Sequence, residues 1–266
     1  MHEAPQLDLD AHRDAGDLIA TTLVLFARHA LLFLSVTLLI VAPVVILIDG
    51  VWAGGFADGG GADVTTAPAI AAAVPLLLTP VLVTALHVTI VRDLGEGRVP
   101  TVMQALRSAA PRFPLAIAAL AGYALLVMGG VILLIVPGIW VFVAGYFATQ
   151  AAVMERRGPL DAFRRSSELV EDRWWRTAGT LVFGLVVLNG AFYPMALAID
   201  KIDSGAVYIA VSILLEVLTL SLSALFGTLL YFSLRARKAQ PSGPALVGGY
   251  LPPLSPTPAG PPPAEL

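Results

Sequence analysis

The chain contains no cysteine, and this absence excludes disulfide bonds, thiolate metal sites and cysteine nucleophiles. Charged side chains are also scarce, because Asp, Glu, Lys and Arg make up only 13% of the 266 residues. A soluble domain carries roughly 25% charged residues. So few charges cannot cover the surface of a water-soluble fold, and most of this surface must therefore face something other than water.

Hydrophobic residues take the place of the missing charges: they account for 57% of the chain, and the mean hydropathy is +0.82. A helix that crosses a bilayer needs about 20 mostly apolar residues. We therefore expect an all-α, polytopic integral membrane protein with six transmembrane helices. The apolar stretches that predict them are residues 23–48, 67–91, 114–136, 139–154, 177–199 and 206–234.

The third stretch can end at either of two turns. A turn at Gly129-Gly130 would leave a helix of about 15 residues, which is too short to span, whereas a turn at Pro137-Gly138 gives about 23. We favour the second turn because the residue before a proline avoids helical angles. Gly129-Gly130 then becomes a close-packing point inside the helix. The fourth stretch is short, and we expect its helix to continue past Glu155.

The basic residues predict the orientation of the chain. All Lys and Arg residues except Lys201 lie in alternate gaps between the apolar stretches or at the edges of those gaps. By the positive-inside rule, both termini and the second and fourth loops are then cytoplasmic. The acidic residues 1–22 lack the basic start and the small-residue cleavage site of a signal peptide. We therefore expect a multi-pass protein of a bacterial plasma membrane.

The C-terminal tail differs in composition from the rest of the chain. Residues 239–266 hold nine of the 20 prolines, and such a segment cannot bury a core. We expect an acidic cytoplasmic segment (1–22), a six-helix transmembrane domain (23–238) and a disordered, Pro-rich cytoplasmic tail (239–266). Two Pro-x-x-Pro spacings leave open whether the tail docks on a partner or is a passive extension.

The chain looks like three copies of one unit, in which a cytoplasmic amphipathic segment precedes a helical hairpin. The amphipathic segments begin near residues 14, 101 and 158. Each places a basic or aromatic cluster just before the apolar stretch. Repeats of this kind are common in membrane transport folds. They are equally typical of proteins that duplicated a stable hairpin, so the repeat alone does not favour transport.

The third amphipathic segment predicts an interfacial helix on the cytoplasmic leaflet, with Leu160, Phe163, Val170 and Trp174 on one face. The spacing of its charges predicts two ion pairs, Asp161–Arg165 and Asp172–Arg176. The helix is either only a topological anchor, with tryptophans at headgroup depth, or a contact surface for a protein partner or anionic lipid. The candidate contact residues are Arg164, Arg165, Trp174, Trp175 and Arg176.

Residues 136–179 resemble the glycerophosphoryl diester phosphodiesterase membrane-domain family and its bacterial relatives. Two further segments, 16–29 and 94–109, are similar to the corresponding parts of the first two units, so the resemblance covers roughly residues 14–235. The matching residues of the third unit are Pro137, Gly138, Glu155, Gly158, Pro159, Ala162, Arg164, Arg165, Ser166, Leu169, Trp175 and Arg176.

This resemblance implies a six-helix membrane domain, and the name of the family does not by itself imply an activity for this chain. In members of the family that carry activity, hydrolysis belongs to a separate soluble domain, which has no counterpart in these 266 residues. Glu171 and Asp172 stand where relatives often carry a basic residue and a glycine. This departure weakens the interpretation of that helix face as a site for anionic headgroups.

Glu216 is the only acid deep inside an apolar stretch, and Ser212, Thr219 and Ser223 share its helical face. It lies about 15 Å from the outer end of the sixth stretch, at about 1.5 Å per residue. A carboxyl group at that depth is costly. It serves either a proton, cation or substrate path, or only a hydrogen-bonded helix interface. The sequence leaves four partners open, with His87 disfavoured by its depth: His87, Asn189, Tyr193 and Gln150.

Motifs for catalysis and cofactor binding are missing. The four histidines have no metal-ligand spacing, no Gly-rich loop precedes a Lys-Ser or Lys-Thr pair, and no serine nucleophile elbow occurs. Basic residues at membrane edges favour the lipid bilayer, and not nucleic acid, as the partner. We therefore expect a non-enzymatic scaffold or assembly component with a protein partner on its cytoplasmic face and no cofactor. The alternative is a small transporter or lipid-handling protein that uses Glu216.

Overall fold

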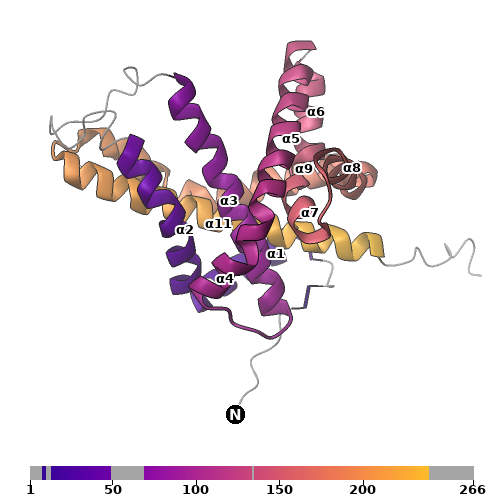
Figure 1. Cartoon of the computed structure of the whole chain (residues 1–266), viewed down its shortest axis with the longest axis horizontal. Coiled ribbons are helices and arrows are strands. Elements are labelled where there is room, and N and C mark those ends of the chain that lie inside the picture. The colour runs from indigo at the N-terminus through magenta and orange to yellow at the C-terminus, as the bar shows by residue number, and fades with distance from the viewer. Residues whose placement is uncertain (1–7, 10–12, 49–68, 134, 240–266) are drawn as a thin grey trace, which may run out of the picture.

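The structure is a computed structural model that describes residues 8–9, 13–48, 69–133 and 135–239 (Figure 1). The described residues are α-helical and contain no strand, as the all-α prediction requires. The predicted Pro-rich tail falls almost entirely outside them. The long helices are α1 (Ala15–Arg28), α2 (Ala30–Val45), α3 (Ala69–Gly95), α5 (Phe113–Leu133), α9 (Trp174–Gly190) and α11 (Gly205–Ala239). The shorter ones are α4 (Val102–Ala109), α6 (Ile135–Gly145), α7 (Ala148–Glu155), α8 (Pro159–Val170) and α10 (Tyr193–Ala198).

Five helical stretches among the described residues are long and apolar enough to cross a membrane. This finding supports a multi-pass membrane protein. The stretches correspond to five of the six predicted helices. They are Ala30–Ile48, Leu77–Gly95, Val102–Ile132, Val136–Glu155 and Gly205–Ala239.

The remaining predicted stretch, residues 177–199, is not one long helix. It is divided between α9, which has 17 residues, and α10, which has six. At about 1.5 Å per residue, α9 alone is about 26 Å long and falls short of the roughly 30 Å apolar layer. The break at Ala191-Phe192 follows Gly190, a poor helix former, and precedes Pro194, which has no N–H group to donate.

The three amphipathic segments share one local structure. In each, a short or amphipathic helix ends at a break and a longer apolar helix follows. The breaks are His29 between α1 and α2, the 3₁₀ turn Ala110–Arg112 between α4 and α5, and the 3₁₀ turn Glu171–Arg173 between α8 and α9. The first apolar helix therefore begins at Ala30 and not at residue 23 as predicted, because α1 runs across that position.

Helix α5 ends at Leu133 and α6 begins at Ile135, so the first helix of this hairpin ends before the predicted turn at Pro137-Gly138. Pro137 is the third residue of α6, where a helix leaves its N–H groups without intrahelical partners, so the proline removes nothing. The prediction that Gly129-Gly130 lies inside a helix is confirmed. A Cβ on Gly130 would lie 3.1 Å from the Cα of Gly138, so the two helices approach closely at this pair.

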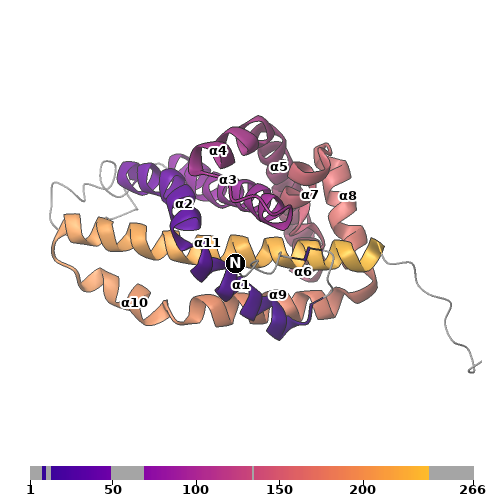
Figure 2. The ribbon, with the colours of Figure 1, turned by 90° about the horizontal axis from the view of Figure 1, so that it is seen from below.

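The second half of α11 is the centre of the fold. The helix runs along the length of the molecule (Figure 2) and packs against α1, α2, α3, α8 and α9. Leu225, Phe226, Leu229 and Tyr231 are fully buried in the main core. At 35 residues, or about 52 Å, α11 exceeds the apolar layer and carries its last basic residues beyond it.

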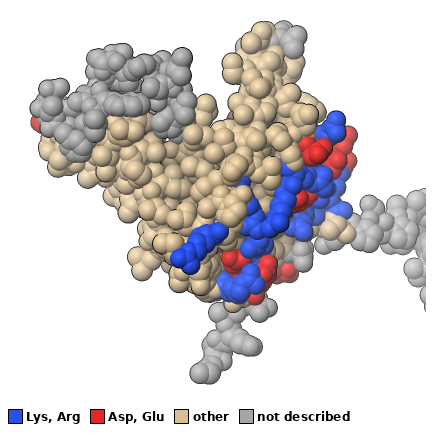
Figure 3. Space-filling view, in the orientation of Figure 1, with Lys and Arg blue, Asp and Glu red and all other residues tan. Residues whose placement is uncertain are grey.

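Charged side chains gather in a band along one side of the molecule, and most of the rest of the visible face is free of them (Figure 3). Along the described chain, charged residues concentrate after α3, after α7 and just before α9. Such a separation is typical of a protein whose apolar helices lie in lipid and whose helix ends reach the headgroups.

The close approach of α9 to α11 gives the first prediction. A Cβ on the buried Gly184 would lie 2.0 Å from the Phe226 ring, so Gly184→Ala must displace a core aromatic. We expect it to lower the free energy of unfolding by about 1–3 kcal/mol, the usual cost of overpacking. Thermal unfolding in a mild detergent measures this loss. Gly179→Ala in the same helix is the control, because nothing lies within 4 Å of its Cβ. Equal stability of the two variants would contradict the packing.

Candidate functional site

One face of α8 docks into the body of the protein. The buried residues of this helix are Ala162, Ser166, Leu169 and Val170. Of the predicted apolar face, Val170 is buried against the body, Phe163 and Trp174 are half-buried, and Leu160 is 65% exposed. The docking surface also uses a small residue and a serine, which a hydrophobicity pattern does not count.

Ser166 completes the backbone hydrogen bonding where α6 ends and α7 begins. The N–H of Phe147 donates to the Ser166 hydroxyl oxygen at 3.1 Å, and the hydroxyl donates to the carbonyl oxygen of Ala144 at 2.6 Å. All three residues are buried. A side chain from α8 thus satisfies two backbone groups that the helix break would otherwise leave without partners.

Glu155, the last residue of α7, gathers three donors from three parts of the chain. Arg157 Nε lies 2.7 Å from its carboxylate, Arg165 Nε 3.0 Å and the Tyr231 hydroxyl 3.0 Å. The predicted continuation of the helix past Glu155 was wrong, because Arg156 adopts a left-handed conformation (φ 51°) and ends it. Partial burial opposes the charge of Arg165, but its ion pair with Glu155 raises the pKa of Arg165 above the ordinary value.

The predicted contact residues therefore fall into two groups. Arg165 is an internal tie between α7 and α8, and Trp174 is half-buried, with its indole N–H donating to the carbonyl of Trp140 at 3.3 Å. Arg164, Trp175 and Arg176 are exposed instead. The Trp175 side chain is 83% accessible, and the Arg164 and Arg176 side chains are 75% and 58% accessible.

Neither predicted i,i+4 ion pair forms. Asp161 pairs with Arg164 at 3.7 Å, one residue before the expected partner. Asp172 pairs with Lys238 at the end of α11, and this hydrogen-bonded ammonium lowers the pKa of Asp172. Arg176 pairs with Asp14 before α1 at 3.0 Å. The charges bind distant segments to one another because the ends of α1, α9 and α11 meet at the same side of the molecule.

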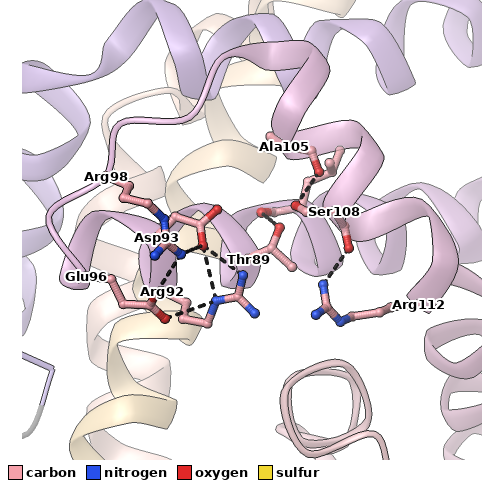
Figure 4. A network of polar contacts seen from close by, with 9 residues as sticks. Thr89, Arg92, Asp93, Glu96, Arg98, Ala105, Ser108 and Arg112 are labelled. Atoms are coloured by element: carbon pink, nitrogen blue, oxygen red, sulfur yellow. Dashed lines mark hydrogen bonds and ion pairs between the residues drawn. The ribbon is translucent and has the colours of Figure 1, made fainter.

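A second charged network lies where α3 ends and α4 begins (Figure 4). The nearly buried Asp93 accepts from Arg92 at 2.8 Å and from Arg98 at 2.9 Å, and Glu96 pairs with the same two arginines. Thr101 and Gln104 then form a reciprocal cap that starts α4. This network fixes the chain reversal between the second unit and the helix before it.

The predicted polar seam lines a groove of about 380 Å³ between α9–α10 and α11. Ser212, Glu216 and Thr219 face this groove together with Asn189 and Tyr193. Two of the four candidate partners of Glu216 therefore share its groove. The Thr219 hydroxyl donates to the Leu215 carbonyl of its own helix at 2.9 Å, so it contributes little polarity to the groove.

Ser223, the fourth seam residue, faces a different space. It lines a cavity of about 200 Å³ between α3, α5, α6, α7 and α11, which also receives Tyr146 and Gln150. The Asn189 amide donates to the Ser223 hydroxyl at 3.1 Å, so this hydrogen bond lies between the groove and the cavity. The Oε1 atom of Gln150 is buried and has no hydrogen-bond partner among the described residues.

His87 is a structural residue of the core. Its Nδ1 lies 2.8 Å from the Val83 carbonyl, its Nε2 lies 3.0 Å from the Ser221 hydroxyl, and the ring stacks on Phe33 with 5.1 Å between centroids. Both ring nitrogens therefore have partners, and neither is Glu216. The described residues contain no group of three or more His, Asp or Glu side chains that could hold a metal ion.

Sequence reasoning missed the roles of Glu155, Ser166 and Tyr231. The first two are among the residues that carry the family resemblance, which was the available signal. Tyr231 gave none, because an aromatic residue near the end of an apolar helix is typical of any membrane interface.

Two neighbouring serines of α8 give the second prediction. Ser166→Ala leaves the buried Phe147 N–H and Ala144 carbonyl without their partner, so we expect a loss of about 1–3 kcal/mol in the free energy of unfolding. Ser167 carries a buried hydroxyl with no partner, so Ser167→Ala is expected to be neutral or stabilising. Thermal unfolding in detergent compares the two. The same loss in both variants would show that the hydroxyl–backbone bonds do not hold α8.

The comparisons with known proteins concern the C-terminal part of the chain. Residues 97–239 match the family described as "Domain of unknown function (DUF7847)". No curated protein and no solved structure matches the chain. The matched segment begins in the loop after α3, ends with α11, and contains both the α8 docking site and the Glu216 groove. Because it spans more than half of the 266 residues, the chain belongs to this DUF7847 family.

Proposed function

We propose that the protein crosses a bacterial plasma membrane six times as three hairpins, with both termini in the cytoplasm. Two observations support this topology. Each amphipathic segment has the same succession of helix, break and longer helix, and the charged side chains gather on one side of the molecule (Figure 3). The sixth crossing would be α9 together with α10. The resemblance to the phosphodiesterase membrane-domain family favours the same arrangement.

Within this membrane domain we propose a non-enzymatic role as a scaffold or assembly component. The observation that carries the proposal is that α8 and the start of α9 have one face buried against the body and another face exposed. Ala162, Ser166 and Leu169 fix the helix from one side. Arg164 and Trp175 extend from the other surfaces and make no tertiary ion pair or hydrogen bond within the described residues. They are free to bind a partner without unfolding the domain.

The chemistry of this surface favours an acidic partner protein at the cytoplasmic headgroup layer. Arginine presents several donors to carboxylates, and tryptophan contributes a large contact area at the centre of protein interfaces. Arg173 lies two residues before Trp175 and adds positive charge, whereas Arg176 is paired with Asp14.

The third prediction separates binding from folding. We expect the double variant Arg164→Gln, Trp175→Ala to unfold at the same temperature as the natural protein but to lose its partner on native purification from membranes, and not to restore the phenotype of a deletion strain. Arg165→Gln is unsuitable as a probe, because it breaks the tie to Glu155. If the double variant restores the phenotype and retains the partner, the scaffold role assigned to this surface is wrong.

The alternative function is transport or lipid handling in the Glu216 groove. The specific observation in its favour is that Glu216, an acidic residue within a long apolar helix, lines a groove of about 380 Å³. Intramembrane acids typically mark ion, proton or substrate paths. The polar cavity around Gln150, next to the Asn189–Ser223 hydrogen bond, would extend such a path toward α3 and α5.

The fourth prediction tests this alternative in the same deletion strain. If transport is the function, Glu216→Gln should fold normally and fail to restore the phenotype, because the amide cannot take up or release the proton. Thr219→Val is the matched control: it lines the same groove, but its hydroxyl is bonded to its own helix. Restoration by Glu216→Gln together with failure of the Arg164, Trp175 double variant would favour the scaffold over the transporter.

A further inference from the structure

Three arginines lie at the ends of three apolar helices on the charged side of the molecule. Arg92 is in the last turn of α3, Arg112 directly precedes α5, and Arg156 directly follows α7. Arg112 lies within electrostatic range of both other arginines. Helices α3, α5 and α7 all pack against one another, and Arg92 and Arg112 lie at neighbouring helix ends (Figure 4).

The carboxylates of this region already form ion pairs. Asp93 and Glu96 each pair with both Arg92 and Arg98, so two acids neutralise two arginines. Arg112 donates only to the neutral carbonyl of Ser108. Figure 4 shows the Arg92 and Arg112 side chains pointing toward the same space between the end of α3 and the start of α5.

Arg156 also lacks a counterion, since it makes no ion pair or hydrogen bond with any residue that the structure describes. It is exposed and is the one non-glycine residue with positive φ in that part of the chain, at 51°. Glycine or asparagine would occupy this conformation at lower cost. Arg112 and Arg156 therefore act on each other as two positive charges, and neither has a paired acid among the described residues. Asp93, which is paired with Arg92 and Arg98, also acts on Arg112 but forms no ion pair with it.

We propose that Arg112 and Arg156, with Arg92 beside them, form a binding site for the phosphate of an anionic lipid headgroup. A phosphate group supplies the missing negative charge, and several oxygens that accept from guanidinium donors. The position argues for a lipid and not for a soluble phosphate ester, because all three arginines stand within one turn of an apolar helix end. That is the depth at which a leaflet places its phosphates.

This site is distinct from the α8–α9 surface and from the Glu216 groove, and it does not depend on either proposed function. Its arginines come from the helix ends that meet beside the second unit. A bound phosphate would hold α3, α5 and α7 together at the membrane surface, so the lipid would act as a structural ligand of this helix cluster.

The experiment is native mass spectrometry of the full chain released from nanodiscs of phosphatidylcholine that contain a minority of phosphatidylglycerol. We expect one retained phosphatidylglycerol per protein. The double variant Arg112→Gln, Arg156→Gln should retain it at least about tenfold more weakly, because two charge-assisted contacts are lost. Arg112→Lys, which keeps the charge but not the planar fork, should retain an intermediate amount.

The matched control is the pair Arg28→Gln, Arg235→Gln, which removes the same net charge from exposed positions outside both proposed binding surfaces. It should retain the lipid as the natural chain does. Equal lipid loss in this control would overturn the proposal in favour of a general charge effect. A double variant with unchanged retention and an unchanged unfolding temperature would overturn it directly. A second arm titrates inorganic phosphate into protein in phosphatidylcholine nanodiscs. Tight, Arg112-dependent phosphate binding without phosphatidylglycerol retention would overturn the assignment to lipid.

Discussion

The burial of the second half of α11 is the packing constraint on which the other elements depend. Leu225, Phe226 and Leu229 have no exposed surface, and the helices that pack on α11 come from the first and third units of the chain. In a bilayer, apolar contact with lipid competes with apolar contact between helices, so close fit and not hydrophobicity decides the arrangement. The absent side chain of Gly184 opposite Phe226 is therefore as much a part of this core as the aromatic ring.

Helix breaks are the second constraint, because a backbone group without a partner is costly wherever water is scarce. The fold meets it with side chains from other elements. Ser166 of α8 supplies both the donor and the acceptor that the α6–α7 break needs. At the end of α7, the Glu155 carboxylate accepts hydrogen bonds from Arg165 and Tyr231. The amphipathic helix is thereby part of the domain's interior, and only its outer face is available for binding.

The arginines of the charged band have three different structural roles. Arg165 is paired internally and holds two helices together. Arg164 and Arg176 are exposed with nearby acids, as is typical of a contact surface. Arg112 and Arg156 have no acid paired with them among the described residues and face one another's charge. A count of basic residues by loop treats all of these as equivalent, but the packing separates structural arginines from those able to bind a partner or a lipid.

The sequence by itself determined the helical class, the apolar stretches and the helical face that carries Glu216, because these follow from composition and from spacing within one helix. It also located the three amphipathic segments. Only the tertiary structure decided where the α5–α6 turn falls, that α9 and α10 are separate, which face of α8 is buried, and that Asp172 pairs with Lys238 and not with Arg176. Those outcomes depend on contacts between residues far apart in the chain. For Asp172, packing brings Lys238 closer in space than Arg176, although Arg176 is nearer in the sequence.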